Sequence, residues 1–333
     1  MSLLQSTLDA LQASAGVRIA NLEMIPIHGP DHAPVDYLTL DEALARETVT
    51  ISEVSEGGSV PELHLDNAGP LAVLLVDGEE LLGAKQNRIV NLTLLAPPGR
   101  GLKLPVSCVE QGRWAYDSPR FRAGRHTLHA GMRARKSRQV SAALRESGTR
   151  HADQGAIWDD IDELQSCLLA APSATRAMAD VYAGRGAELD DYLRRVRALP
   201  GQTGAAFAVN GQLRGLELFD TATTLERLLP KLIASYALDA LREQEPVGTA
   251  SGGMDLDTLL GRLRAARVEA YPALGEGRDL RLEGRDFGAG ALQARERVVH
   301  LTAFPLPAES RSAGRGRTSG GMARASSRHR RRG

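Results

Sequence analysis

Three apolar runs lie between residues 71 and 110, and the segments that connect them are too short to contain a crossover helix. The runs are LAVLLVDG (71–78), RIVNLTLL (88–95) and LKLPVSCVE (102–110). Parallel strands require a crossover of about a dozen residues or more, whereas antiparallel strands are joined by tight turns. We therefore expect antiparallel strands here, within a β-rich first part of the chain that spans residues 17–110.

The pattern changes to helical spacing in a middle block, residues 111–200. Its segment 130–147, AGMRARKSRQVSAALRES, places Met132, Val140 and Leu144 at intervals that bring them to one helical face. We expect this block to be helical.

The last block, residues 201–307, returns to strand-like patterns around one long helix. Asn210 and Gly211 lie between two apolar segments and predict a type I′ hairpin. The long helix contains Pro230, where a kink is expected. Residues 1–307 are therefore predicted to form a single composite α+β domain. In this fold, mostly antiparallel, sheet-forming N- and C-terminal halves flank an inserted helical block.

Composition excludes several classes of protein. Apolar residues make up 42% of the chain and charged residues 25%, as in globular domains. No apolar run reaches the roughly 18 residues of a membrane-spanning helix, so no membrane partner is expected. The first residues have no basic start and already include Asp9, which is unlike a signal peptide. Two cysteines cannot form a disulfide framework. These features predict a cytoplasmic protein.

A basic tail accounts for the zero net charge of the whole chain. Residues 308–333 contain eight arginines and one acid, so the rest of the chain carries a net charge of −7. The tail is rich in Gly, Ser and Arg and has no apolar face, so we expect it to be disordered. It is either a non-specific contact for nucleic acid or phosphate, or a solvated extension without such a role.

The segment GEELLGAKQNR, residues 78–88, is the first candidate site. Its glycines predict turns, and its polar residues directly precede an apolar run. Cations and amides in such a position suit phosphates and sugar hydroxyls, and a carboxylate beside them could act as a base or hold a metal. The alternative is a charged surface turn with internal salt bridges. The candidate residues are Glu79, Glu80, Lys85, Gln86, Asn87 and Arg88.

The segment SCVEQGRW, residues 107–114, is the second candidate. On a strand, Cys108 and Glu110 would face the same side and could share a pocket. Arg113 and Trp114 could form a cation-π pair or a shelf for a base, although simple packing is the alternative. A nucleophilic cysteine needs a base, and none is assured nearby, so we interpret Cys108 as a buried structural residue.

A basic helix is the third candidate. Arg133 and Lys136 share one helical face, which could hold a polyanionic ligand. Alternatively, this face pairs with the acidic run 153–163 that follows. The histidine pairs of the chain resemble metal ligands in spacing only, so no metal site is predicted.

Several of these segments together resemble one family. They are GEELLGAKQNR, SCVEQGRW, the Arg133-x-x-Lys136-x-x-x-Val140 helix, DQGAIW, GAAFAVNGQLRGLELFD and GAGALQARERVVHLTAF. Over residues 15–305 the chain is similar to the ARG- and rhodanese-phosphatase-superfamily-associated protein domain. The family name refers to ADP-ribosylglycohydrolases and phosphatases. The resemblance therefore implies a link to ADP-ribose or other NAD-derived nucleotide metabolism.

Two functional hypotheses follow, and the sequence indicates no cofactor for either. The first is a ligand-binding domain, which could be an enzyme, for a phosphorylated nucleotide sugar of the ADP-ribose type. Glu80 or Glu110 would be its acid or base, and Arg113 and Arg133 would join Lys85 and Arg88 on phosphates. The second is a non-catalytic module that binds nucleic acid or a modified protein. A scaffold without a small ligand is a third interpretation.

Overall fold

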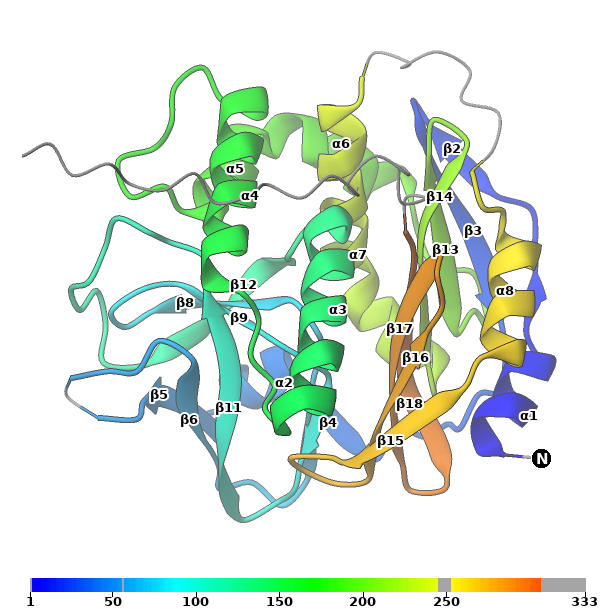
Figure 1. The fold of residues 1–333 in the computed structure, drawn as a ribbon, viewed down its shortest axis with the longest axis horizontal. Coiled ribbons are helices and arrows are strands. Elements are labelled where there is room, and N and C mark those ends of the chain that lie inside the picture. Colours follow the sequence, from blue (N-terminus) through cyan, green and yellow to red (C-terminus); the bar gives the residue numbers. More distant parts are fainter. Residues whose placement is uncertain (1, 56, 245–252, 307–333) are drawn as a thin grey trace, which may run out of the picture.

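The computed structural model describes residues 2–55, 57–244 and 253–306 and has the α+β class that the sequence predicts. The expected tail, 308–333, lies outside the described residues. The helices of the described residues are α1 (Leu3–Asp9), α2 (Leu40–Ala45), α3 (Ala130–Ser147), α4 (Gln154–Leu168), α5 (Met178–Gly184), α6 (Gly186–Arg195), α7 (Ala222–Arg242) and α8 (Leu256–Ala265) (Figure 1).

A large antiparallel sheet joins the first strands of the chain to the last ones. Its strands are β1 (Gln12–Ala13), β2 (Val17–Ile19), β3 (Leu22–His28), β13 (Gly204–Val209), β14 (Gln212–Phe219), β15 (Val268–Pro272), β16 (Arg278–Glu283), β17 (Phe287–Ala294) and β18 (Arg297–Pro305). Their order is β1-β3-β13-β14-β18-β17-β16-β15, and β2 pairs with β3. The predicted hairpin connects β13 to β14, with φ values of 52° at Asn210 and 75° at Gly211.

Two smaller sheets are formed by residues 37–127. Strands β12, β8, β9, β11, β6 and β5 form one antiparallel sheet in that order, and β10, β7 and β4 form the other. In the second sheet, β4 and β7 are parallel, unlike the other pairs. The bounds are β4 (Tyr37–Thr39), β5 (Val49–Glu53), β6 (Glu62–Asn67), β7 (Ala72–Leu75), β8 (Glu79–Gly83), β9 (Arg88–Val90), β10 (Leu94–Ala96), β11 (Arg100–Cys108) and β12 (Phe121–Thr127).

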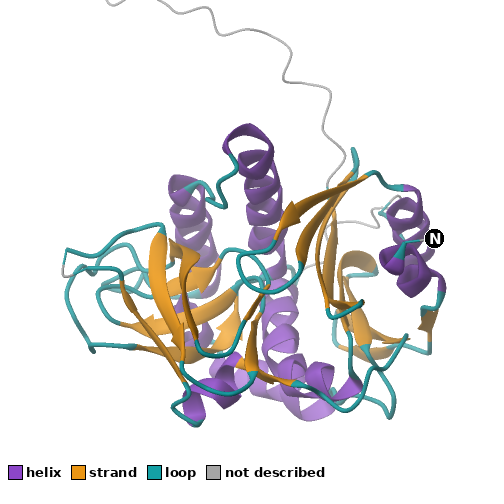
Figure 2. Ribbon diagram, turned by 90° about the horizontal axis from the view of Figure 1, so that it is seen from below, coloured by secondary structure: helices purple, strands orange, loops and turns teal. Residues whose placement is uncertain are grey.

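The elements stack in layers. Helices α3 and α7 lie between the small sheets and the large sheet, and α1 and α8 cover the other face of the large sheet (Figures 1 and 2). Three separate clusters of apolar side chains are buried between these layers. One cluster surrounds α7, a second lies under α1 and α8, and a third fills the small sheets. Burial of this aliphatic surface is the main stabilising term.

Several local predictions needed correction. Within the β-rich part, the apolar segment 17–27 is a hairpin rather than one strand, because Ala20 has a φ of 51° and separates β2 from β3. The run 88–95 is likewise two strands, β9 and β10, which belong to different sheets. Residues 79–83, expected in a turn region, form β8. The N-cap of α2 is Thr39, which forms a capping box with Glu42.

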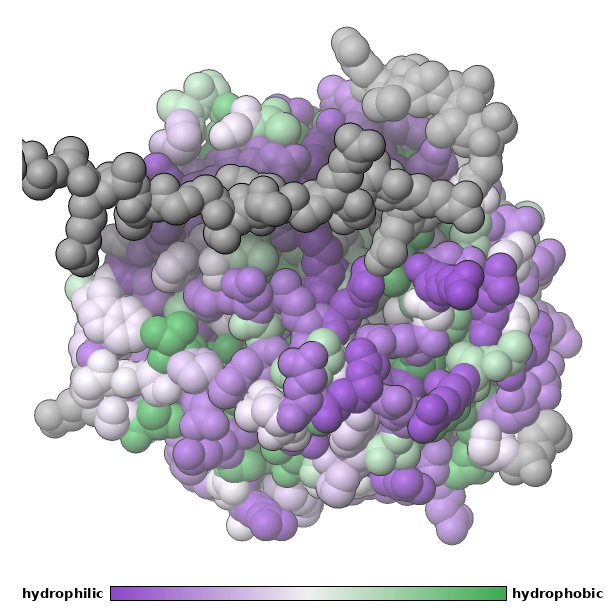
Figure 3. Space-filling view, viewed as in Figure 1, coloured by the Kyte–Doolittle hydropathy of each residue, from purple (hydrophilic) through white to green (hydrophobic). Residues whose placement is uncertain are grey.

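The middle block 111–200, expected to be helical, begins instead with strand β12 at residues 121–127, and its helices start only at Ala130. Helix α3 has the bounds of the predicted segment, and it ends at Gly148 in the left-handed conformation, with a φ of 70°. Helix α7 continues through Pro230. No helix in the described ranges is long and apolar enough to cross a membrane. Figure 3 shows hydrophilic side chains over much of one face, with hydrophobic ones in small separate patches.

Candidate functional site

The turn between β8 and β9 is closely held by its own side chains. Gly83 has a φ of 118°, and a Cβ there would lie 2.4 Å from the Ser118 hydroxyl and 3.0 Å from the Arg120 carbonyl. Glycine is therefore required for both the conformation and the space. The Gly83 amide donates to the Oδ1 atom of Asn87 at 3.1 Å, which closes the turn. The four predicted residues after this glycine, Lys85, Gln86, Asn87 and Arg88, are all buried.

Asn87, Glu110 and Arg113 form one hydrogen-bonded group. The amide of Asn87 donates to Glu110 Oε2 at 3.0 Å. Arg113 donates to both Glu110 oxygens, at 2.9 and 2.6 Å, and to Asn87 Oδ1 at 3.1 Å. A guanidinium with this bidentate geometry holds a carboxylate in its ionised form. The two predicted motifs thus meet in space.

Arg88 lies beneath this group and is incompletely paired. Its Nη1 atom donates to Gln86 Oε1 at 2.9 Å, and its Nη2 atom is 3.8 Å from Glu53 Oε1. Its Nε and Nη2 atoms have no hydrogen-bond partner, although the side chain is fully buried. Burial lowers the pKa of Arg88, and the nearby carboxylates of Glu53 and Glu110 oppose this effect. A buried guanidinium with free donors is costly unless a ligand completes its hydrogen bonds.

Two exposed aromatic rings flank Lys85 above Arg88. The Lys85 Nζ atom lies 5.4 Å from the Trp114 ring and 5.1 Å from the Tyr116 ring. The Arg88 guanidinium lies 5.6 Å from the Trp114 ring. Trp114 is 47% exposed and Tyr116 53%. We call these four side chains the aromatic-cation shelf. It combines flat apolar faces open to solvent with positive charge, which suits a nucleobase and a phosphate.

Glu80 lies on β8 and differs from its neighbours in having no partner. The side chain is fully buried, and neither carboxyl oxygen has a hydrogen-bond partner. Burial, with a further contribution from Glu110, raises the pKa of Glu80 to about 8. The side chain packs against Gly124 of β12, where a Cβ would lie 2.9 Å from its Oε2 atom. Glu80 is therefore a neutral acid at pH 7, and it lies close to Glu110.

Glu79, also predicted as a ligand residue, is paired elsewhere. It accepts hydrogen bonds from the Val76 amide at 2.8 Å and from Lys231 Nζ at 2.9 Å. Lys231 of α7 also contacts Asp41 at 2.7 Å. Successive strand residues point to opposite faces, so Glu79 and Glu80 have different surroundings.

Arg133 belongs to a separate buried network. It donates to Glu217 at 2.6 and 3.3 Å, and His300 Nε2 lies 3.2 Å from the same carboxylate. Burial alone would raise the pKa of Glu217, but Arg133 and His300 hold it at about 2. Lys136, on the same helical face, contacts Asp77. This face of α3 is therefore buried and paired with the sheets, rather than with the acidic run 153–163.

Cys108 has surroundings typical of a structural cysteine. Its amide and carbonyl are both bound by the Gln154 side chain, at 2.8 Å each. Burial raises the pKa of its thiol to about 11, so the thiolate is scarce at neutral pH. His126 stacks on Tyr182, and His129 is bound to Asp239 at 2.7 Å. Among the described residues, no group of three or more His, Cys, Asp or Glu side chains has a metal-binding arrangement.

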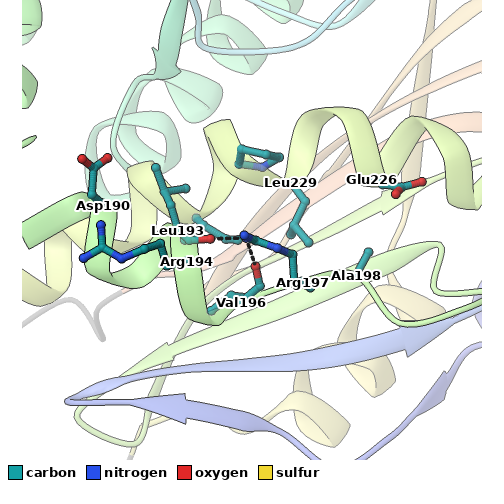
Figure 4. A pocket seen from close by; sticks show the side chains of 10 residues that line it. Asp190, Leu193, Arg194, Val196, Arg197, Ala198, Glu226 and Leu229 are labelled. Carbon is teal, nitrogen blue, oxygen red and sulfur yellow. Dashed lines mark hydrogen bonds between the residues drawn. The ribbon is translucent and has the colours of Figure 1, made fainter.

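A cavity of about 340 Å³ lies between α6 and α7, away from these motifs. Leu229 and Ile233 contribute apolar surface. Figure 4 shows the Arg197 guanidinium in contact with the Leu193 and Val196 carbonyls. None of the predicted site residues lines this cavity.

Sequence reasoning missed several neighbours of the cluster. Tyr116 could have been found, because residues two apart in an extended chain face the same side, as Trp114 and Tyr116 do. Glu53, which lies on β5 beside Arg88, gives no such signal. Tyr182 comes from α5, and only the tertiary structure brings it close to Glu80.

Comparison with known proteins identifies the family but no individual relative. A family model described as the ARG and Rhodanese-Phosphatase-superfamily-associated Protein domain matches residues 10–304. No curated protein and no solved structure matches the chain. The matched region includes the β8–β9 turn and the aromatic-cation shelf.

Proposed function

The chain belongs to the ARG and Rhodanese-Phosphatase-superfamily-associated Protein domain family, and we propose that it binds a phosphorylated nucleotide sugar of the ADP-ribose type at the β8–β9 turn. The observation that carries this proposal is the aromatic-cation shelf, in which Trp114 and Tyr116 flank Lys85 above a partly unpaired Arg88. The family name adds an associational link to ADP-ribose chemistry.

The shelf matches the two chemical parts of such a ligand. A nucleobase would stack on the exposed Trp114 and Tyr116 rings, which accept any base face. The phosphates would interact with Lys85 and with the free donors of Arg88. Movement of the half-exposed Trp114 ring would open the path to Arg88.

The pair of carboxyl groups supports a catalytic role for the site. Burial raises the pKa of Glu80 to about 8, whereas Glu110 is paired with Arg113 at 2.6 Å. In many enzymes the general acid and the general base are two carboxyl groups whose different surroundings give them different pKa values. Glu80 would be the acid of the site, and Glu110 would orient the ligand by accepting a hydrogen bond from a ribose hydroxyl.

Calorimetric titration with ADP-ribose tests the phosphate contact. We expect Arg88→Ala to lose roughly 1.5–3 kcal/mol of binding free energy, the range of charged hydrogen bonds. Arg88→Lys should not restore affinity, because lysine lacks the planar fork. The exposed Arg100→Ala variant is the matched control and should bind like the wild type. Equal affinity in all four proteins would reject the phosphate assignment.

Trp114→Ala provides a second test that carries little risk of misfolding, because the ring is half-exposed. The variant should lose about 1–3 kcal/mol of the free energy of binding to ADP-ribose, because the base can no longer stack on the ring. Titration with a single-stranded oligonucleotide distinguishes the alternative function. If the oligonucleotide binds with steep salt dependence and ADP-ribose does not bind, the chain is a nucleic-acid binding module.

A further inference from the structure

Glu53 and Arg88 are two buried side chains of opposite charge that face each other without a hydrogen bond. Their side chains are 3% and 0% exposed, and the Arg88 Nη2 atom lies 3.8 Å from Glu53 Oε1. A charged hydrogen bond is shorter, at about 2.7–2.9 Å. Among the described residues, neither Glu53 oxygen has a hydrogen-bond partner, and the Nε and Nη2 atoms of Arg88 have none either. Unsatisfied acceptors and donors therefore lie side by side, which is costly in a buried position.

The six-stranded sheet places both side chains on one face. Glu53 lies opposite Leu63, and Leu63 lies opposite Leu104 of β11. Four residues further along β11, Cys108 lies opposite Arg88. Opposite residues of antiparallel strands share a face, and so do residues four apart on one strand. Strands β5 and β12, at the two ends of the sheet order, contact each other, so this face is the apolar inside of a curled sheet.

The pair lies at an end of this curled sheet, next to the aromatic-cation shelf. Glu53 is the last residue of β5, and Arg88 is the first residue of β9. A Cβ at Gly58, which has a φ of 76°, would lie 3.2 Å from the Trp114 ring and 3.4 Å from Glu53 Oε2. The Arg88 guanidinium is 5.6 Å from the same ring. The half-exposed Trp114 ring thus borders both the buried pair and the solvent.

The chemistry of the pair limits which ligand group can satisfy it. The group must donate to Glu53 and accept from Arg88. A hydroxyl does both, whereas an ionised phosphate only accepts and would bring a second negative charge against the carboxylate. The vicinal hydroxyls of a ribose supply two donors for the two carboxylate oxygens. An acidic residue binds the ribose 2′-hydroxyl in the same way in dinucleotide-binding folds.

We propose that Glu53 and the Nη2 atom of Arg88 bind the vicinal hydroxyls of the ribose next to the base, so that Glu53 selects ribose over 2′-deoxyribose. This inference rests on the proposed function, because it names the group between the stacked base and the phosphates. The phosphates keep their contacts with Lys85 and the Arg88 Nε atom. The path that opens to Arg88 when the Trp114 ring moves also leads to Glu53, since both border this ring.

Calorimetric titration with ADP and 2′-deoxy-ADP tests the contact, because the two ligands differ by one hydroxyl. The wild type should bind ADP at least about tenfold more tightly, the ratio that one charged hydrogen bond provides. In Glu53→Gln this ratio should fall to roughly threefold, because a neutral hydrogen bond is weaker. The variant should lose affinity for ADP and bind 2′-deoxy-ADP almost as the wild type does. Glu62→Gln, on the next strand, is the matched control and should keep the wild-type ratio, because Glu62 pairs with exposed Lys103.

The outcomes separate the ribose contact from the proposed function. A merely structural role of Glu53 would weaken the binding of both ligands by one factor, and that result would reject the inference. Equal affinities of the wild type for ADP and 2′-deoxy-ADP would also reject it but leave the nucleotide site in place. Absence of ADP and ADP-ribose binding would overturn the proposed function and the ribose contact together. If Glu53→Gln does not fold, Glu53→Asp replaces it, and its withdrawn carboxylate should likewise lower the ratio.

Discussion

At the residue scale, Glu79 and Glu80 show how adjacent identical side chains acquire different chemistry. Glu79 accepts hydrogen bonds from Lys231 and the Val76 amide, whereas Glu80 is buried without a partner. The alternation of a strand separates them, and the partner of Glu79 comes from a helix 152 positions away in the chain. The sequence could identify both as candidates but could not distinguish their roles, because the distinction depends on long-range packing.

The first prediction concerns the pH dependence that Glu80 imposes on stability. Its pKa is about 8 when folded, against a usual value of 4.5, so the folded state holds an extra proton between these pH values. The free energy of unfolding therefore falls as pH rises through this window, on the order of 1 kcal/mol per pH unit. Glu80→Gln removes this titration. In urea unfolding, the free energy of unfolding of Glu80→Gln should rise relative to that of the wild type between pH 5 and pH 8.

A constant difference between the two proteins across that range would show that folding does not raise the pKa of Glu80. Glu62→Gln is a suitable control, because Glu62 is only partly buried and pairs with exposed Lys103 at 3.0 Å. Surface pairs of this kind contribute about 0–1 kcal/mol and should leave the pH profile nearly unchanged.

The second prediction is that Cys108 is not a nucleophile. Its thiol is fully buried and its pKa is raised to about 11, whereas Cys167 is exposed. Iodoacetamide at pH 7 should therefore label Cys167 and leave Cys108 unmodified, as peptide mapping would show. Cys108→Ser should lose some stability but still bind ADP-ribose. Rapid stoichiometric labelling of Cys108 would contradict this assignment.

At the element scale, sequence periodicity predicted the helices better than the strands. The observed bounds of α3 agree with the predicted ones. The apolar residues repeat at helical spacing along the segment, and a glycine cap ends the helix. Strand β8 was missed because Glu79 and Glu80 are poor strand formers, and pairing with β12 and β9 overrides that preference. The 78–88 and 107–114 segments lie side by side because β9 pairs with β11.

The third prediction concerns the buried face of α3. Arg133→Met leaves Glu217 as an uncompensated buried charge, so the variant should lose about 3–5 kcal/mol of unfolding free energy. Arg135→Met lies on the same helix and is the matched control. Arg135 is 49% exposed and pairs with Asp160, so its loss should cost less than about 1 kcal/mol. Chemical denaturation of both variants gives the comparison, and equal costs would mean that the Arg133 network adds nothing beyond a surface pair.

At the scale of the whole molecule, the class of the fold was predictable but its sheet membership was not. Strand β3 was expected within the β-rich first part, yet it pairs with β13 of the C-terminal part. Antiparallel pairing follows from short connections, as the 71–110 region illustrates. The partner of a strand more than a hundred residues away has no local signal in one sequence. The large sheet therefore emerged only from the structure.

The last prediction concerns the basic tail, residues 308–333, which lies outside the described residues. The rest of the chain carries a net charge of −7 against +7 for the tail, so the two attract each other electrostatically. Exposed charge pairs contribute little, however, and the tail has no apolar face to bury. Deletion of 308–333 should thus leave the melting temperature nearly unchanged in calorimetry at low and at physiological salt. A loss of several degrees at low salt that disappears in 1 M salt would reveal an electrostatic contact between the tail and the acidic body.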